Sequence, residues 1–234
     1  MGLWRLIRED FATVKKHDPA LHNNFELLFN YPGVWALFFY RISHALYRRG
    51  WRFLPRLISA IGQFLTTVDI HPGARMGRRI FIDHATGVVI GETAIVGNDV
   101  LIYQQVTLGG VSLSHGKRHP TVEDNVIIGA GAKVLGNITI GRDSKIGANS
   151  VVIKDVPSGC TAVGVPARVA QRIDGKAPLS HNIMPDVNKQ VFEYLLKRIA
   201  VLEHTIKTGD LETMEKTDQE LDEVYKTFIE AMKG

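Results

Sequence analysis

The chain has 234 residues, of which 45% are hydrophobic and 22% are charged, and its formal net charge is +4. This is the composition of an ordinary soluble globular protein of one or two domains, and without a run of basic residues it gives little support to a nucleic-acid partner. No apolar stretch approaches the roughly 20 residues that a membrane span needs, and the first residues lack the core of a signal peptide. The single cysteine, Cys160, cannot form an internal disulfide, so we expect a cytoplasmic protein without a membrane or nucleic-acid partner.

Residues 1–68 are predicted to form an N-terminal helical region. Its first segment carries apolar residues at helical spacing, which are Leu3, Leu6, Ile7, Phe11 and Val14. Asp18 and Pro19 end this segment. Two further apolar stretches follow, the first at residues 25–47 with an interruption at Tyr31-Pro32-Gly33, and the second at residues 53–68. We therefore expect several helices ahead of the next region.

A six-residue repeat of aliphatic side chains runs through residues 69–170. Thirteen residues mark it: Ile70, Met76, Ile82, Ile90, Val96, Ile102, Leu108, Val122, Ile128, Val134, Ile140, Ile146 and Val152. A period of six fits neither an amphipathic helix nor a simple two-sided strand, but it is the signature of a parallel β-helix. Short strands of a sandwich fit less well, because they recur about every 8–12 residues. We therefore predict a mainly β fold in which three units close one triangular coil, and trimer formation is the usual way to cover its flat outer faces.

Residues 171–185 are predicted to be a linker, and residues 186–234 a C-terminal helical extension. The extension carries two apolar stripes, the first at Val191, Leu195, Ile199, Leu202 and Ile206, the second at Met214, Leu221, Val224 and Phe228. We interpret it as a helical hairpin that packs on itself or on the trimer. A partner-binding or oligomerising coiled coil is the alternative, but each stripe spans only two or three heptads.

The repeat is interrupted twice, and polar residues collect at both interruptions. The first, at residues 82–90, contains Asp83 and His84, and the second, at residues 108–122, contains Arg118 and His119. Loops that interrupt a rigid scaffold commonly carry function. We therefore expect the functional residues of the domain at these two insertions.

His84 is a candidate general base, because imidazole titrates near neutrality. Asp69 could orient it, because it lies 15 residues earlier, three short of a full coil, near the same edge one layer away. Arg118 is suited to recognising a carboxylate with its planar bidentate fork. On spacing alone, a structural corner histidine and a solvated surface arginine remain the alternatives.

Metal catalysis is an alternative, because some hexapeptide-repeat proteins are zinc carbonic anhydrases that use three histidines. His115 and His119 are four residues apart, and His71 and His84 lie in the same predicted domain. Spacing of four aligns two ligands on a helix, whereas this loop is rich in glycine. We therefore predict no metal site.

Seven strings of the sequence resemble serine O-acetyltransferases, hexapeptide-repeat acyltransferases that make O-acetylserine for cysteine synthesis. They are DIHPGA at 69–74, DHATG at 83–87, GET at 91–93, VTLGG at 106–110, RHP at 118–120, IGAGAK at 128–133 and GVPAR at 164–168. The strings at 83–87 and 118–120 together are the most specific. The resemblance covers roughly residues 15–170, and it implies a left-handed β-helix, acetyl-CoA as co-substrate and L-serine as acceptor.

The resemblance also implies residue roles, with His84 as the general base and Asp69 as its partner. The residues implied to hold the amino acid are Asp18, Asp83, Arg118 and His119, and those implied to contact coenzyme A are Gly110, Ala130, Ala148 and Arg168. In this family the active sites lie between neighbouring subunits, and L-cysteine binds in the same pocket as a feedback inhibitor.

Two departures from the family pattern bear on its partners. The helical region before Asp69 is short for an assembly of two trimers, so we expect a homotrimer, with a hexamer as the fallback. The chain ends at Gly234 rather than at the isoleucine with which family members dock O-acetylserine sulfhydrylase, so we do not expect that complex.

We expect direct transfer in a ternary complex, with His84 deprotonating the serine hydroxyl and a backbone N–H near Gly109 and Gly110 stabilising the oxyanion. Cys160 as an acyl-carrying nucleophile is the rival, but no histidine lies near it in sequence. Homoserine or a sugar is an alternative acceptor, although a sugar offers no carboxylate to Arg118. A non-catalytic trimeric scaffold is the alternative outside the enzymes.

Overall fold

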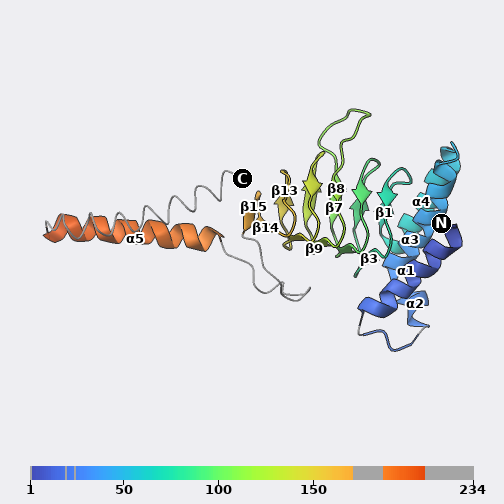
Figure 1. The fold of residues 1–234 in the computed structure, drawn as a ribbon, viewed down its shortest axis with the longest axis horizontal. Coiled ribbons are helices and arrows are strands. Elements are labelled where there is room, and N and C mark those ends of the chain that lie inside the picture. Colours follow the sequence, from blue (N-terminus) through green and yellow to red (C-terminus); the bar gives the residue numbers. More distant parts are fainter. Residues whose placement is uncertain (1, 19, 24, 171–186, 209–234) are drawn as a thin grey trace. The chain divides into compact units, whose positions relative to one another are not determined.

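The computed structural model describes residues 2–18, 20–23, 25–170 and 187–208 (Figure 1). The chain divides into two compact units, residues 1–177 and residues 178–234. The second unit contains α5 (Val187–Thr208), a helix that includes the first of the two predicted apolar stripes. The predicted linker at 171–185 and the second stripe lie outside the described residues.

The N-terminal region of the first unit is helical, as predicted. Its helices are α1 (Leu3–His17), α2 (Glu26–Phe29), α3 (Pro32–Tyr47) and α4 (Phe53–Thr66). Pro32 stands at the first position of α3, where its fixed φ and missing N–H are tolerated, and it separates α3 from α2. The apolar stretch at 25–47 is therefore two helices.

Residues 69–170 form short strands that are joined by corners. The strands are β1 (Asp69–Ile70), β2 (Arg75–Met76), β3 (Phe81–Ile82), β4 (Val89–Ile90), β5 (Ile95–Val96), β6 (Leu101–Ile102), β7 (Thr107–Gly109), β8 (Thr121–Val122), β9 (Ile127–Ile128), β10 (Lys133–Leu135), β11 (Thr139–Ile140), β12 (Lys145–Ile146), β13 (Val151–Val152), β14 (Thr161–Gly164) and β15 (Ala167–Ala170). Each of β1–β13 contains one residue of the six-residue repeat.

Every third strand falls in the same sheet, so three strands make one coil of the prism. The first sheet has the order β1-β4-β7-β10-β13, the second β11-β8-β5-β2, and the third β15-β14-β12-β9-β6-β3. Neighbouring strands pair in parallel, except for the antiparallel pair β14 and β15. The repeat residues stack inside the prism, where the most exposed of them, Met76, is only 8% exposed. The fold is thus the predicted left-handed parallel β-helix.

Helices α3 and α4 close the first coil by bonding the backbone groups of its open edge. The Tyr40 hydroxyl donates to Ala74 O at 2.7 Å and accepts from Met76 N at 3.1 Å. Ser59 Oγ donates to Ile70 O at 2.9 Å. An uncovered strand edge leaves backbone donors and acceptors without partners, so these side chains substitute for a further coil.

A buried ion pair completes this cover. Arg41 Nε lies 2.9 Å from Asp10 Oδ2, and this pair joins α3 to α1. The two Nη atoms of Arg41 donate to Met76 O at 2.9 Å and to Gly77 O at 2.7 Å. Breaking such a pair leaves a buried charge without a partner, which costs several kcal/mol, about 3–5 by precedent. The helical region and the β-helix are therefore tied together by polar contacts as well as by packing.

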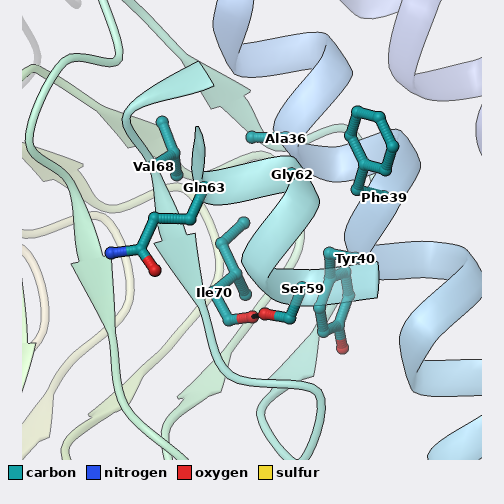
Figure 2. A pocket seen from close by; sticks show the side chains of 8 residues that line it. All are labelled: Ala36, Phe39, Tyr40, Ser59, Gly62, Gln63, Val68 and Ile70. Carbon is teal, nitrogen blue, oxygen red and sulfur yellow. Dashed lines mark hydrogen bonds between the residues drawn. The ribbon is translucent and has the colours of Figure 1, made fainter. Parts of the chain in front are cut away.

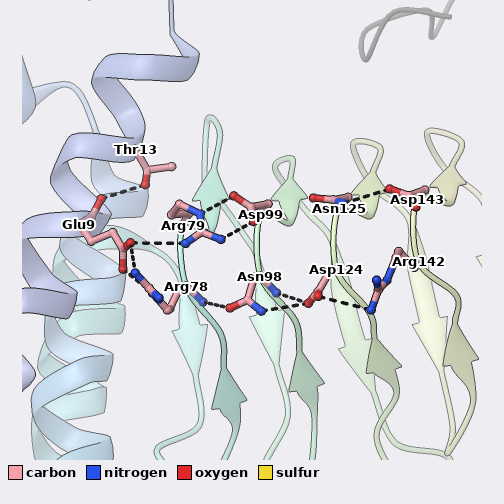
Figure 3. Close-up of polar contacts among 10 residues, drawn as sticks. All are labelled: Glu9, Thr13, Arg78, Arg79, Asn98, Asp99, Asp124, Asn125, Arg142 and Asp143. Carbon is pink, nitrogen blue, oxygen red and sulfur yellow. Dashed lines mark hydrogen bonds and ion pairs between the residues drawn. The ribbon is translucent and has the colours of Figure 1, made fainter. Parts of the chain in front are cut away.

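The corner between the second and third sheets carries a ladder of polar side chains (Figure 3). It consists of Arg78, Asn98, Asp124 and Arg142 in one row and Arg79, Asp99, Asn125 and Asp143 in the other. Glu9 of α1 joins both rows at the first coil, with Oε1 2.7 Å from Arg78 Nη2. The ladder therefore fixes the stacking of this corner and attaches α1 to it.

Helix α1 packs on β3, and this contact positions the first candidate site. Val14 and Phe81 share a buried apolar cluster, and the ring of His17 stacks on that of Phe81 with centroids 6.0 Å apart. The residue that follows α1 is Asp18, and the residue that follows β3 is Asp83. The packing thus brings together two acidic residues that are 65 positions apart in the sequence.

Candidate active site

The first insertion forms the corner between the third and the first sheets. Asp83 N donates to Ile102 O at 2.8 Å, and the next two residues, His84 and Ala85, adopt left-handed backbone conformations with φ of 57° and 52°. This geometry turns the His84 side chain outward, where it is 73% exposed. Asp83 Oδ2 lies 4.0 Å from His84 Nε2, so a carboxylate stands beside the imidazole.

Asp18 adds a second carboxylate near this corner. Tyr31 Oη donates to Asp18 Oδ2 at 2.7 Å, and burial together with this bond raises the pKa of Tyr31 to about 12. The pKa of Asp83 is raised, chiefly because its carboxyl is desolvated and partly because Asp18 carries a second negative charge nearby, while His84 opposes the rise. Two acidic groups at the corner that carries His84 suit a ligand with an ammonium group.

Two tyrosines at this site were missed by the sequence reasoning. Tyr31 holds Asp18, and Tyr103 lies one coil from Asp83, where burial and the Asp83 charge raise the pKa of its hydroxyl. Tyr103 follows the repeat residue Ile102 as Asp83 follows Ile82, so its place could have been found by aligning the repeat units.

Asp69 begins β1 in the first sheet, in register with Val89 of β4. In the part of the chain that the structure describes, its side chain makes no hydrogen bond or ion pair with His84. The carboxylate that contacts His84 is that of Asp83. The predicted pairing of Asp69 with His84 therefore stays a prediction.

The second insertion follows β7 and forms the corner between the first and second sheets. Arg118 and His119 lie here against the turn that follows β4, with Arg118 Nη2 2.6 Å from Glu92 Oε2. His119 is 8% exposed, and its pKa is lowered by burial first and then by the charges of Arg118 and Lys117. Arg118 and His119 are thus partly or fully buried groups with polar partners, rather than solvated loop residues.

The small residues predicted to contact coenzyme A fall at both corners. Ala130 and Ala148 follow β9 and β12, at the same corner as His84 and stacked above it, with Asn149 N donating to Ala130 O at 2.8 Å. Gly110 instead lies at the other corner, where an added Cβ would be 3.2 Å from Arg118 O. Arg168 lies on β15, paired with Val163 of β14.

The predicted residues therefore form two groups at two corners of the prism. We call these the His84 corner, with Asp18, Asp83, His84, Ala130 and Ala148, and the Arg118 corner, with Gly110, Arg118 and His119. Because a different corner of the same coils carries each group, a single chain does not bring them into one site.

Other features of the structure lie outside both corners. Figure 2 shows a small pocket whose lining residues are Ala36, Phe39, Tyr40, Ser59, Gly62, Gln63, Val68 and Ile70, none of them from either group.

Among the residues that the structure describes, no cluster of three or more His, Cys, Asp or Glu side chains is placed to hold a metal. In the same ranges, no helix combines the length and the apolar character that crossing a membrane requires.

Comparison with known proteins first defines the class. The family described as bacterial transferase hexapeptide (six repeats) matches residues 119–154, so this part of the β-helix has the repeat of hexapeptide transferases. A serine acetyltransferase of Synechococcus elongatus is 51% identical over 92% of this chain and 88% of its own length. The chain therefore belongs to the serine acetyltransferase family, and it is an acyltransferase of cysteine biosynthesis.

Solved structures agree with this assignment. Soybean serine acetyltransferase complexed with serine has a TM-score of 0.69 and 46% identity, covering 72% of this chain and 69% of its own. A serine acetyltransferase in complex with coenzyme A from Brucella abortus has a TM-score of 0.69 and 42% identity, covering 74% and 69%. A serine acetyltransferase complex with cysteine has a TM-score of 0.72 and 43% identity, covering 75% and 68%.

Proposed function

We propose that the protein transfers the acetyl group of acetyl-CoA to the hydroxyl of L-serine, giving O-acetyl-L-serine and coenzyme A. The observation that carries this proposal is the outward-facing His84 with the Asp83 carboxylate 4.0 Å away and Asp18 acting on Asp83, in a chain 51% identical to a serine acetyltransferase. Relatives crystallised with serine and with coenzyme A support the two substrates.

His84 acts as the general base in a single transfer step. Its imidazole takes the proton from the serine hydroxyl while that oxygen attacks the thioester carbonyl. The tetrahedral intermediate then collapses, the C–S bond breaks, and the protonated imidazole returns the proton to the leaving thiolate of coenzyme A. Asp69 stabilises the imidazolium, and a backbone N–H near Gly109 and Gly110 stabilises the oxyanion.

The charges at the two corners suit the two ends of an amino acid. Asp18 and Asp83 attract the ammonium group of serine at the His84 corner, where the second negative charge already raises the pKa of Asp83. Arg118 binds the carboxylate through its guanidinium fork, and His119 assists as a hydrogen-bond donor. Acetyl-CoA lies along the small positions Gly110, Ala130 and Ala148, with Arg168 toward its nucleotide end.

A complete site then requires two subunits, because the two corners of one chain face different directions. In a homotrimer, each chain places its His84 corner against the Arg118 corner of its neighbour, a head-to-tail contact that closes as a ring. L-Cysteine, with a thiol in place of the hydroxyl, fits the same amino-acid groups, and we propose it as an inhibitor. The cysteine complex of a relative supports this proposal.

Thiol release from acetyl-CoA by the purified protein tests the reaction, with serine, homoserine or a galactoside as acceptor. We expect release that depends on serine and that is at most weak with the other two acceptors. Release driven as well by the galactoside, which has no carboxylate for Arg118, would contradict the proposed recognition. Equal release without any acceptor would show a thioesterase instead.

A further inference from the structure

The turn Gly91-Glu92-Thr93 follows β4 and lies against the Arg118 corner, and the function proposed above gives its residues no role. Gly91 makes room for the ring of His119, since an added Cβ would lie 2.0 Å from both Cδ2 and Nε2 of that ring. No side chain fits in that space, so the imidazole packs directly on the glycine backbone. The position of the His119 ring therefore requires glycine at residue 91.

Thr93 holds the Arg118-His119 dipeptide by its backbone and by the imidazole at once. Its Oγ1 accepts from Arg118 N at 3.0 Å and from His119 N at 3.1 Å. A hydroxyl has two acceptor lone pairs and one donor. With both lone pairs engaged, the hydroxyl hydrogen is directed to His119 Nδ1, which lies 2.8 Å from Oγ1.

A second donor on the same nitrogen fixes the tautomer of His119. The backbone N–H of Thr93 points at Nδ1 from 3.2 Å, and a backbone N–H can only donate. Nδ1 therefore carries the lone pair, and the neutral ring has its proton on Nε2. The lowered pKa of His119 agrees with a neutral ring, since burial and two nearby cations disfavour the imidazolium.

The proton on Nε2 lies on the side of the ring next to Gly110, a residue predicted to contact coenzyme A. Nε2 lies beside Gly110, at 3.3 Å from the position that a Cβ of this residue would take. An N–H at this point attracts an oxygen acceptor such as a carboxylate. The opposite tautomer would present a lone pair there and repel the same group.

Glu92 completes the arrangement by orienting the guanidinium. Its Oε2 accepts from Arg118 Nη2 at 2.6 Å, and its Oε1 accepts from Tyr47 Oη at 3.4 Å, which links the pair to α3. Arg118 Nη1 donates to Ser114 O at 3.3 Å. The guanidinium is thus held from two sides before any ligand arrives.

We propose that Gly91-Glu92-Thr93 is a positioning element that keeps His119 in the Nε2–H tautomer, as a fixed donor to the carboxylate of the amino-acid substrate. Thr93 sets the tautomer and Glu92 aims Arg118, while neither residue touches the reacting atoms. The ligand assigned here rests on the proposed function, whereas the tautomer rests on the contacts of Thr93 alone.

The test compares Thr93→Val, which keeps the shape but removes the hydroxyl, with Thr93→Ser, which restores it. Thr139→Val is the matched control, a threonine on β11 outside both corners. Ring ¹⁵N shifts are read from the full-length protein labelled with [¹⁵N]histidine, with the His119 signals assigned by their loss in His119→Asn. Steady-state kinetics with serine follow each variant.

The wild type and Thr93→Ser should show a protonated Nε2 and a bare Nδ1. Thr93→Val keeps the backbone N–H that holds Nδ1 bare, so Nε2 should stay protonated. The KM for serine should rise about tenfold, with a smaller change in kcat, because the three hydrogen bonds by which the hydroxyl holds Arg118 and His119 are lost. Thr139→Val should match the wild type in both readouts.

A wild-type His119 protonated on Nδ1 would overturn the inference, and this result does not depend on the folding of any Thr93 variant. An unchanged KM for serine in a folded Thr93→Val protein would overturn it as well. If the wild type releases no thiol with serine, the proposed function fails, and the ring ¹⁵N shifts still decide the inference about the tautomer.

Discussion

Replacing His84 with asparagine is expected to lower kcat for serine acetylation by about 10²–10⁴-fold, the usual contribution of a general base. Asparagine keeps a polar side chain at the corner but cannot accept a proton at neutral pH. The side chain is 73% exposed and lies 4.0 Å from Asp83, so the fold should be preserved. The measurement is initial-rate thiol release at saturating serine and acetyl-CoA, with circular dichroism to verify folding.

His115→Asn is the matched control for this substitution. His115 is exposed in the second insertion and has no assigned role, so the same chemical change there should leave kcat within about twofold, as is usual for surface sites. A folded His84→Asn protein that keeps more than a tenth of the wild-type kcat would show that another group removes the serine proton.

Removing the guanidinium of Arg118 is expected to raise the KM for serine on the order of 10²-fold, because Arg118→Ala loses a charge-assisted contact that a substrate carboxylate needs. The KM for serine of Arg118→Lys should fall between those of the wild type and Arg118→Ala, since lysine keeps the charge but loses the planar fork. The KM for acetyl-CoA should change much less. Substrate-saturation curves for each variant give both constants.

Arg142→Ala provides the comparison for a lost surface arginine. Arg142 lies on the ladder at the third corner, where it is 61% exposed and 3.7 Å from Asp124. The Arg142→Ala variant should leave the KM for serine unchanged. Equal increases in the KM for serine and for acetyl-CoA in Arg118→Ala would argue that the arginine supports the loop rather than the carboxylate.

The β-helix could be predicted from sequence because its period is local and repeated. Each repeat residue, from Ile70 to Val152, lies on its own strand and points inward. Helix α3 was predicted as an element, but its function as a cover was not, because the bonds of Tyr40 and Arg41 to the first coil join residues more than 30 positions apart. No spacing rule indicates contacts of that range.

The site could be predicted in part. Both insertions contain the residues that the structure shows as ordered polar groups, but their separation at two corners was not anticipated. Counting repeat units would have shown it, because each unit advances one sheet, and the insertions follow the third unit at Ile82 and the seventh at Leu108. The part taken by Thr93 had no local signal, since its partners lie 25 and 26 residues away.

The central claim is that one active site is built from the His84 corner of one chain and the Arg118 corner of another. Mixing His84→Asn and Arg118→Ala chains tests it most directly, by co-expression with different tags and purification through both. In a trimer that contains both chains, one of the three contacts joins two intact corners, so at serine concentrations near the wild-type KM the account predicts about a third of the wild-type activity from two nearly inactive parents. Activity no higher than the mean of the two parents, in oligomers shown to contain both chains, would contradict a shared site.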